Sequence, residues 1–300
     1  MEEIAVDLYP TRVSSTPSIT LRHDPVVYSQ GPDYNAGPLT IDELRSYEQN
    51  GYLSLEDVFS EQEVGDMLAE LQSIWVEGAL SNTPEIIRER ESDEIRSVFA
   101  VHKNNALFNR LSRDPRLMDV VSQVLDSDVY VHQSRINFKP GFRGKDFYWH
   151  SDFETWHVED GMPRMRAISF SVLLDDNLPY NGSLMLVPGS HKKFVACVGE
   201  TPKEHYKESL RKQQFGVPDE ESLSRLVGEN RIDMPVGRKG SVLMFECNTM
   251  HGSNSNITPF PRRNVFIVYN SVKNALETPF SGGSPRPEFV ASRTPELVIV

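Results

Sequence analysis

The sequence predicts a mainly β fold, a β-sandwich or jelly-roll barrel with helices packed on one side. Helix-start signals gather in the first 125 residues, and from Val129 onward the hydrophobic period changes to two. Short strand-like runs separated by turn residues follow. Helices first and short antiparallel strands afterwards are typical of a β core that carries helices on one face.

Three predicted helices begin at residues that can cap a helix N-terminus. These starts are Thr40 with Glu43, Ser60 with Glu63, and Asp114 with Pro115. Asn50-Gly51 ends the first helix, because glycine readily adopts the left-handed conformation found after a helix. The apolar side chains of the second and third helices recur at helical spacing, which indicates core packing.

The predicted strand 129–139 carries polar side chains on one face, namely Gln133, Arg135, Asn137 and Lys139. The further predicted strands are Ala167–Leu174, Ser183–Val187, Ser241–Phe245 and Asn264–Tyr269.

Composition and charge restrict the class of protein. A hydrophobic content of 38 % supports a large core, so we expect one domain over residues 39–300, preceded by a proline-rich extended arm over residues 1–38. The net charge of −12 argues against a nucleic-acid partner. Neither a membrane span nor a signal peptide is evident, and two cysteines fit a reducing cytoplasm.

His150 and Asp152 are the first candidates for metal ligands. In a strand their side chains share one face, and a second imidazole, His251, follows the predicted strand at 241–245 in a turn. Two imidazoles and one carboxylate form a facial set that leaves about three positions on Fe(II) for a cosubstrate and O2. A bare His-x-Asp pair is a weak signal, and His157 with Glu159 is a competing pair of the same form.

Arg262 has a chemical task beside such a centre. A 2-oxo dicarboxylate that chelates iron needs a cation at its far carboxylate, and arginine donates two parallel hydrogen bonds. Strand parity with Asn264 and Phe266 points Arg262 inward and Arg263 outward, although a register shift of one residue would exchange them.

Longer motifs resemble a known family. The run 147–159 (FYWHSDFETWHVE), its continuation 160–166 (DGMPRMR) and the later PGSH at 188–191 look like the signature of ectoine hydroxylases within the phytanoyl-CoA dioxygenase superfamily. The likeness extends through 197–199 and 201–202, and covers most of the chain after about residue 40. It is therefore more specific than the three candidate ligands alone.

The resemblance implies a double-stranded β-helix of the jelly-roll or cupin type, which hydroxylates the compatible solute ectoine with 2-oxoglutarate and O2. It implies that Fe(II) is held by His150, Asp152 and His251. It implies contacts to 2-oxoglutarate from Lys139, Asn137, Phe147, Ser253 and Arg262, and contacts to ectoine from Gln133, Arg135, Thr155, Trp156 and Phe245. A guanidinium and an aromatic face suit a small cyclic zwitterion, so Arg135 and Trp156 agree with this, with core packing as the less favoured alternative for Trp156.

Other hypotheses stay open at this point. A related oxygenase acting on another small polar metabolite would share these residues. A non-catalytic barrel that binds a metal or a ligand is the alternative from another class. The resemblance also leaves a homodimer open, and no predicted element identifies its interface.

Overall fold

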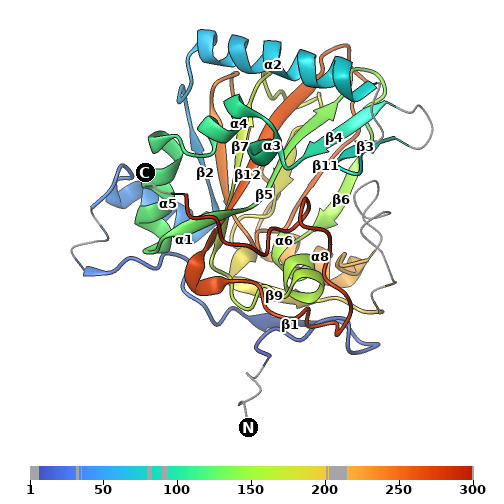
Figure 1. Ribbon diagram of the computed structural model, residues 1–300. Helices are drawn as coiled ribbons and strands as arrows, with labels where there is room; N and C mark the ends of the chain where they lie inside the picture. The colour runs from blue at the N-terminus through green and yellow to red at the C-terminus, as the bar shows by residue number, and fades with distance from the viewer. Residues whose placement is uncertain are drawn as a thin grey trace.

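Two antiparallel sheets packed face to face form the body of the molecule (Figure 1). The computed structural model describes residues 7–31, 34, 36–79, 83–89, 94–200, 202 and 215–298. The large sheet has the order β2 (Tyr52–Leu55), β10 (Val242–Glu246), β7 (Ala167–Leu173), β12 (Arg262–Ser271), β5 (Val129–Lys139), β4 (Ile95–Phe99), β3 (Ile86–Arg88). The small sheet has the order β6 (Phe147–His150), β11 (His251–Ser253), β8 (Leu184–Leu186). A jelly-roll core is therefore confirmed.

Helices cover the outer face of the large sheet (Figure 1). They are α1 (Ile41–Asn50), α2 (Glu61–Ala79), α3 (Val101–Asn104), α4 (Ala106–Leu111) and α5 (Pro115–Leu125). Further helical segments are α6 (Asp152–Thr155), the π-helical turn η2 (Trp156–Asp160), α8 (Glu220–Glu229), and the 3-10 turns η3 (Ser190–Lys192) and η4 (Val272–Asn274). Among the residues described, no helix is both long and apolar enough to cross a membrane.

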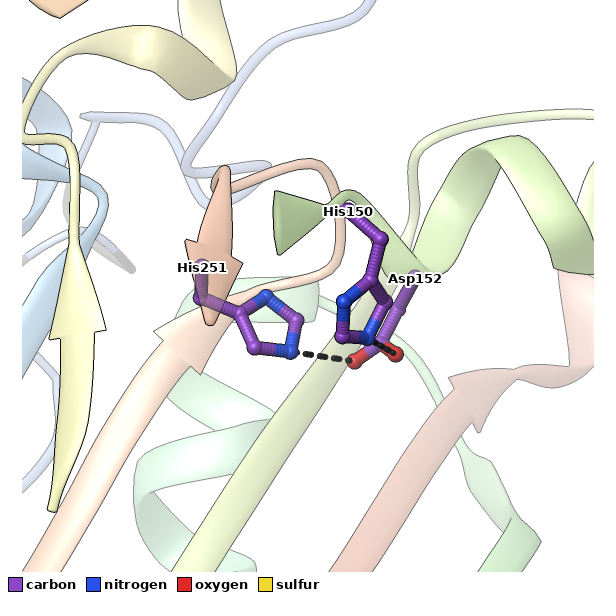
Figure 2. Close-up of side chains that lie close together, drawn as sticks. All are labelled: His150, Asp152 and His251. Carbon is purple, nitrogen blue, oxygen red and sulfur yellow. Dashed lines mark ion pairs between the residues drawn. The ribbon is translucent and has the colours of Figure 1, made fainter. Parts of the chain in front are cut away.

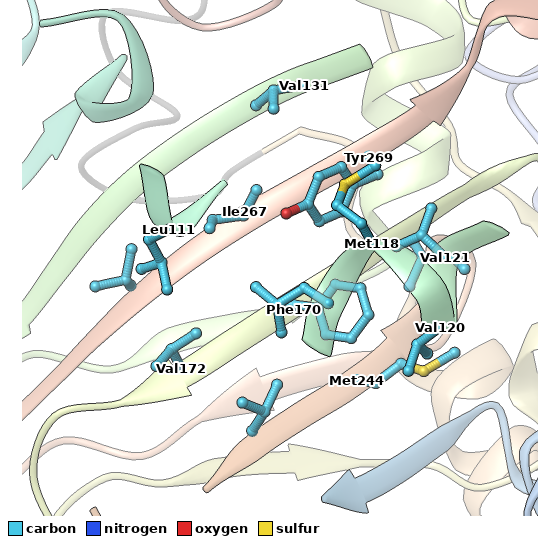
Figure 3. Close-up of a cluster of buried hydrophobic side chains, with 14 of the residues drawn as sticks. Leu111, Met118, Val120, Val121, Val131, Phe170, Val172, Met244, Ile267 and Tyr269 are labelled. Atoms are coloured by element: carbon cyan, nitrogen blue, oxygen red, sulfur yellow. The ribbon is translucent and has the colours of Figure 1, made fainter. Parts of the chain in front are cut away.

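The alternation of side chains along the strands sorts the core into two layers. In β7, Phe170 and Val172 point to the helices and pack with Tyr269 of β12 and Met118 of α5 (Figure 3). In the other layer Phe245 of β10 and Phe266 of β12 meet Leu184 and Leu186 of the small sheet. Successive strand residues face opposite sides of a sheet, so the residues between the outward ones line the space between the sheets.

The predicted helix starts are confirmed by their caps. Thr40 and Glu43 exchange both hydrogen bonds of a capping box, and Gly51 ends α1 with a φ of 79°. Ser60 and Glu63 form the same arrangement before α2, and the Asp114 side chain accepts from Arg116 N at the start of α5. These local hydrogen bonds were readable because each lies within three residues.

The predicted order of helices before strands was wrong. β2 follows α1 directly and pairs with β10, about 190 residues later, while β3 and β4 extend the other edge of the large sheet. Each of these strands has five residues or fewer. Such short runs carry little periodicity, and it is pairing with distant strands that makes them extended.

The N-terminal segment lies against the barrel through β1 (Ser18–Leu21), which pairs with β9 (Lys193–Ala196). Tyr9 is fully buried in a cluster with Phe153, Trp156 and Phe194. Residues 1–6, 32, 33 and 35 of the predicted arm lie outside the described residues, as does position 201 of the family motif. A few side chains of this segment, among them Tyr9, Thr11, Arg12 and Asp24, are thus buried against the body of the molecule, while others such as Val13 and Leu21 are exposed.

Candidate metal centre

Three candidate ligands, His150, Asp152 and His251, converge at one end of the small sheet (Figure 2). His150 Nε2 lies 3.7 Å from Asp152 Oδ1, and His251 Nε2 lies 4.0 Å from Asp152 Oδ2. All three donor atoms lie within 4.8 Å of one another, and within the described ranges this is the one group of His, Cys, Asp or Glu that meets that criterion. Two imidazole nitrogens and a carboxylate suit a first-row transition metal such as Fe(II).

Backbone carbonyls hold both imidazoles in the orientation that a metal needs. His150 Nδ1 lies 2.8 Å from Tyr148 O, and His251 Nδ1 lies 2.9 Å from Thr249 O. A proton on Nδ1 donates to each carbonyl and leaves Nε2 with a lone pair for the metal. Burial, with His251 as the next cause, lowers the pKa of His150 to about 3, so this ring is neutral at physiological pH.

Two local predictions around the ligands were wrong in detail. Asp152 does not share a strand with His150, because β6 ends at His150 and Ser151 caps α6, of which Asp152 is the first residue. His251 does not lie in a turn but begins β11, which pairs with both β6 and β8. The register places His251 directly opposite His150. The two imidazoles therefore meet through strand pairing, and the carboxylate arrives through the start of a helix.

The competing pair, His157 and Glu159, has a different role. His157 bonds through its two ring nitrogens to Met162 O and to Asp7, and its ring stacks on Phe280 with centroids 3.9 Å apart. Glu159 accepts a hydrogen bond from Arg12 at 2.7 Å. Both side chains are buried and committed to structural contacts, so they are not candidates for a metal site.

A pocket beside the ligands is lined by cationic side chains. Arg96, Arg135, Lys139 and Arg262 all face it, together with the ligands His150 and His251. Nε and Nη1 of Arg262, and Nε of Arg135, are buried and have no hydrogen-bond partner within the protein as described. Buried guanidinium donors are nearly always satisfied in folded proteins, so their arrangement indicates an anionic ligand.

The electrostatic strain of this pocket appears in the pKa values. Burial, with Arg262 as the next cause, lowers the pKa of Lys139 to about 6. Burial and then Arg135 lower the pKa of Arg262 to about 10. Several like charges in one buried site disfavour the charged form of each, and a carboxylate between them would relieve the repulsion.

The predicted residues for an oxo-acid cosubstrate gather in this pocket. It is lined by Asn137, Lys139, Phe147, Ser253 and Arg262. Lys139 Nζ donates to Ser253 Oγ at 2.8 Å, and Arg262 Nη2 donates to Asn137 Oδ1 at 3.2 Å. Arg263 turns the other way and pairs with Asp175 at 2.6 Å, which resolves the register of β12.

The residues predicted to contact a substrate are more dispersed. Arg135 lines the pocket, and the Phe245 ring lies 5.1 Å from the His251 ring. Gln133 donates to Val290 O at 2.6 Å, while Trp156 packs edge-on against His132 with centroids 5.0 Å apart. Thr155 is buried in α6. A substrate role for Gln133, Thr155 and Trp156 therefore stays a prediction.

Sequence analysis missed Arg96, which adds a cation to the pocket. Arg96 lies on β4, is 6 % exposed, and pairs with Glu89 at 3.0 Å. Its guanidinium carbon also lies 5.2 Å from the centre of the Phe147 ring. The segment Ile95–Phe99 is extended, but five residues with no flanking turn signal did not identify a strand.

Comparisons with known proteins find similar dioxygenases. The phytanoyl-CoA dioxygenase (PhyH) family model matches residues 47–264. An ectoine dioxygenase of Bordetella bronchiseptica is 55 % identical over 96 % of this chain and 93 % of its own, and one of Stutzerimonas stutzeri is 53 % identical over 96 % and 94 %.

Solved structures are similar as well. The crystal structure of EctD from S. alaskensis with bound Fe superposes with a TM-score of 0.88 at 46 % identity and covers 98 % of both chains. The same enzyme with 2-oxoglutarate and 5-hydroxyectoine gives a TM-score of 0.86 at 47 % identity, over 96 % of this chain and 95 % of that one.

Replacing Asp152 with alanine should weaken metal binding by more than about 100-fold, since even partners one shell further out contribute roughly 10–100-fold. The measurement is an anaerobic titration with Co(II), a redox-stable substitute for Fe(II), followed by absorbance. Asp42→Ala is the control, because the Asp42 side chain is 94 % exposed and lies outside the site. Equal Co(II) affinity in Asp152→Ala and the parent would contradict the assignment.

Proposed function

The chain belongs to the phytanoyl-CoA dioxygenase family, and on that premise we propose that it hydroxylates ectoine to 5-hydroxyectoine with Fe(II), 2-oxoglutarate and O2, releasing succinate and CO2. One observation carries the proposal most directly. The imidazoles of His150 and His251, which meet the Asp152 carboxylate, line a pocket in which Arg262 has unsatisfied buried donors. Relatives named ectoine dioxygenase, at about half identity over nearly the whole chain, support the choice of substrate.

The donor set fits a resident Fe(II). His150, Asp152 and His251 would hold it, and the carbonyls of Tyr148 and Thr249 fix the two rings so that Nε2 faces the ion. Fe(II) in such a set supplies the activation of O2 that is coupled to decarboxylation of the oxo acid. The remaining work, which is binding, orientation and exclusion of water, falls to the side chains of the pocket.

The pocket supplies two cations for the 2-oxoglutarate dianion. Arg262 rises from β12, and its Nε and Nη1 are buried donors without a protein partner among the described residues, which suits hydrogen bonding to a carboxylate. Lys139 from the neighbouring strand β5 lies beside Ser253, whose hydroxyl offers a further contact. Asn137 bonds the Arg262 guanidinium and holds its plane. The far carboxylate of the cosubstrate would thus be fixed by strands of the large sheet.

Arg135 is the side chain best placed for the ectoine carboxylate. It precedes Asn137 and Lys139 on the same face of β5, and its buried Nε has no hydrogen-bond partner among the described residues. The ring of Phe266 lies 5.0 Å from its guanidinium carbon and restricts its movement. A cation held beside aromatic rings next to a metal suits a compact zwitterion better than an acyl chain.

The same proposal includes the setting of the reaction. Residues 39–300 would form one catalytic domain, with residues 1–38 as an arm. Cys197 and Cys247 are buried and free, which agrees with a reducing cytoplasm.

The function is tested by anaerobic reconstitution with Fe(II), followed by addition of 2-oxoglutarate, O2 and ectoine. Mass spectrometry should find a product one oxygen heavier than ectoine, formed in step with succinate. Succinate without hydroxyectoine would reject ectoine and favour an oxygenase for another polar metabolite. Metal binding without either product would favour a non-catalytic barrel.

Arg262→Gln should raise the KM for 2-oxoglutarate by roughly 10–100-fold, since a hydrogen bond between charged groups contributes about 1.5–3 kcal/mol. Arg263→Gln is the matched control, because Arg263 is the next residue and pairs with Asp175 on the opposite side of the strand. Steady-state succinate formation gives both values. Equal KM values in the two variants would contradict the role of Arg262.

Binding of 2-oxoglutarate should take up a proton at neutral pH. Burial and the neighbouring cations Arg262 and Arg96 hold the pKa of Lys139 near 6, against a smaller opposing effect of Asp146 and Glu89. A bound carboxylate raises that pKa, so affinity should fall as pH rises above about 6, by up to about tenfold per unit.

This proton uptake is measured by calorimetry of Co(II)-loaded protein in two buffers of different ionisation enthalpy. Lys139→Met, which carries no titrating group, is the control and should show no uptake from this site. A parent protein that binds 2-oxoglutarate at pH 7.5 without proton uptake would show that Lys139 is already charged, and the prediction would be wrong.

A further inference from the structure

The N-terminal segment contributes two buried arginines to the elements that carry the metal ligands. Arg12 and Arg22 precede α1, and none of the candidate ligands or pocket residues belongs to this part of the described chain. Each arginine reaches a glutamate close in sequence to a ligand. These ion pairs differ from ordinary surface ion pairs in their burial, because every arginine and glutamate side chain in them is at most 4 % exposed.

Arg12 binds the element that begins with Asp152. Its Nε and Nη2 donate to the two carboxylate oxygens of Glu154 at 3.0 and 2.7 Å, and its Nη1 donates to Glu159 at 2.7 Å. Thr11 Oγ1 adds a hydrogen bond to Glu154 at 2.7 Å. Glu154 lies in α6, two residues after Asp152, so the fork fixes the helical turn from which the ligand projects.

Arg22 binds the last residue of β10, Glu246, after which the loop that leads to His251 begins. Its Nη1 lies 2.7 Å from Glu246 Oε1, and Glu246 Oε2 accepts from Asn248 N at 2.7 Å. Asn248 Oδ1 in turn accepts from Ser151 Oγ at 2.8 Å, and Ser151 caps α6. This chain of contacts joins the His251 loop to the residue between His150 and Asp152.

The backbone at Gly216 packs closely against the Arg12–Glu154 ion pair. Gly216 has a φ of 67°, and a Cβ there would lie 2.3 Å from Arg12 Nη2 and 2.4 Å from Glu154 Oε2. Only glycine fits this approach without moving the pair. The Arg12–Glu154 contact is therefore held from both sides, which limits the movement of α6.

Stability alone does not account for these three buried ion pairs. Replacing a buried ion pair by apolar residues is often neutral or stabilising, because burial costs each charge its hydration. What a bidentate guanidinium pair provides is fixed geometry. In this protein the ion pairs lie beside the elements that carry His150, Asp152 and His251, whose donor atoms lie within 4.8 Å of one another.

We propose that Thr11, Arg12 and Arg22 form a clasp that sets the spacing of the metal ligands. They are positioning residues: the clasp fixes α6 through Glu154 and the His251 loop through Glu246, and so holds Asp152 and His251 at the distance the ion requires. The part of this inference that concerns turnover rests on the proposed function, and the part that concerns metal affinity does not.

The test compares Arg12→Lys and Arg22→Lys, which keep the charge and lose the planar fork, with the parent. Co(II) affinity of the full chain should fall by roughly 10–100-fold, the usual effect of residues that orient metal ligands. With Fe(II), 2-oxoglutarate and ectoine, succinate should form in excess of hydroxylated product. Misplaced metal ligands would hold the substrate carbon poorly, so decarboxylation of 2-oxoglutarate would be less well coupled to hydroxylation. If the parent itself fails to hydroxylate ectoine, the proposed function falls and the Co(II) comparison still decides the clasp.

Tyr9→Phe is the matched control. It removes the buried hydroxyl that donates to Asp24 at 2.8 Å and accepts from the backbone N–H groups of His23 and Asp24, without touching a ligand-bearing element through that hydroxyl. Its Tm should fall while its Co(II) affinity stays within about twofold of the parent. Lysine variants that lose Tm as Tyr9→Phe does, and keep parental Co(II) affinity and one succinate per product, would overturn the proposal.

A milder variant keeps the test decisive if a lysine variant does not fold. Thr11→Val retains both charges and the volume of the side chain, and removes the hydroxyl that donates to Glu154 and accepts from Cys197 N. Weaker Co(II) binding at near-parental Tm supports the clasp, and unchanged Co(II) binding overturns it.

Discussion

The pairing of β6 with β11 is the contact on which the metal centre depends. It sets His150 directly opposite His251, although the two lie about 100 residues apart in the chain. Opposite residues of antiparallel strands have their side chains on one face, so both imidazoles turn toward the same point. A slip of one residue in this register would send one imidazole to the other face and abolish the site. The third ligand, Asp152, is the first residue of α6, and its position is set by Ser151, which caps that helix.

The large sheet contributes a different kind of chemistry to the same cavity. Its strands β4, β5 and β12 bring Arg96, Arg135, Lys139 and Arg262 together in an interior where like charges repel one another. Such a cluster costs folding free energy unless an anion neutralises it. The apolar layer between the outward faces of the same strands and the helices stabilises the fold and offsets this cost. Stability and ligand recognition are thus separated by the two faces of one sheet.

Local signals explain what could be predicted from the sequence. The caps at Thr40, Ser60 and Asp114 involve neighbours within three residues, and the period of 129–139 is carried by the strand itself. The inward direction of Arg262 followed from strand parity, whereas the strand face assumed for His150 and Asp152 was wrong because Asp152 lies in α6. Arg96 was missed because β4 becomes a strand only through β3 and β5, and the partners of Arg12 lie more than 140 residues away. Contacts that depend on tertiary structure leave little trace in a local pattern.

The small sheet is too small to hold its ligands by itself. β6 has four residues and β11 three, and α6 is a single turn of four residues that passes into a π-helical turn. Short elements of this kind open easily, since few hydrogen bonds must break. A metal centre with a defined geometry therefore needs support from outside the sheet that carries it. The buried carboxylates of Glu154 and Glu246 are the points where that support is applied, and it comes from the first part of the chain, which contributes no ligand of its own.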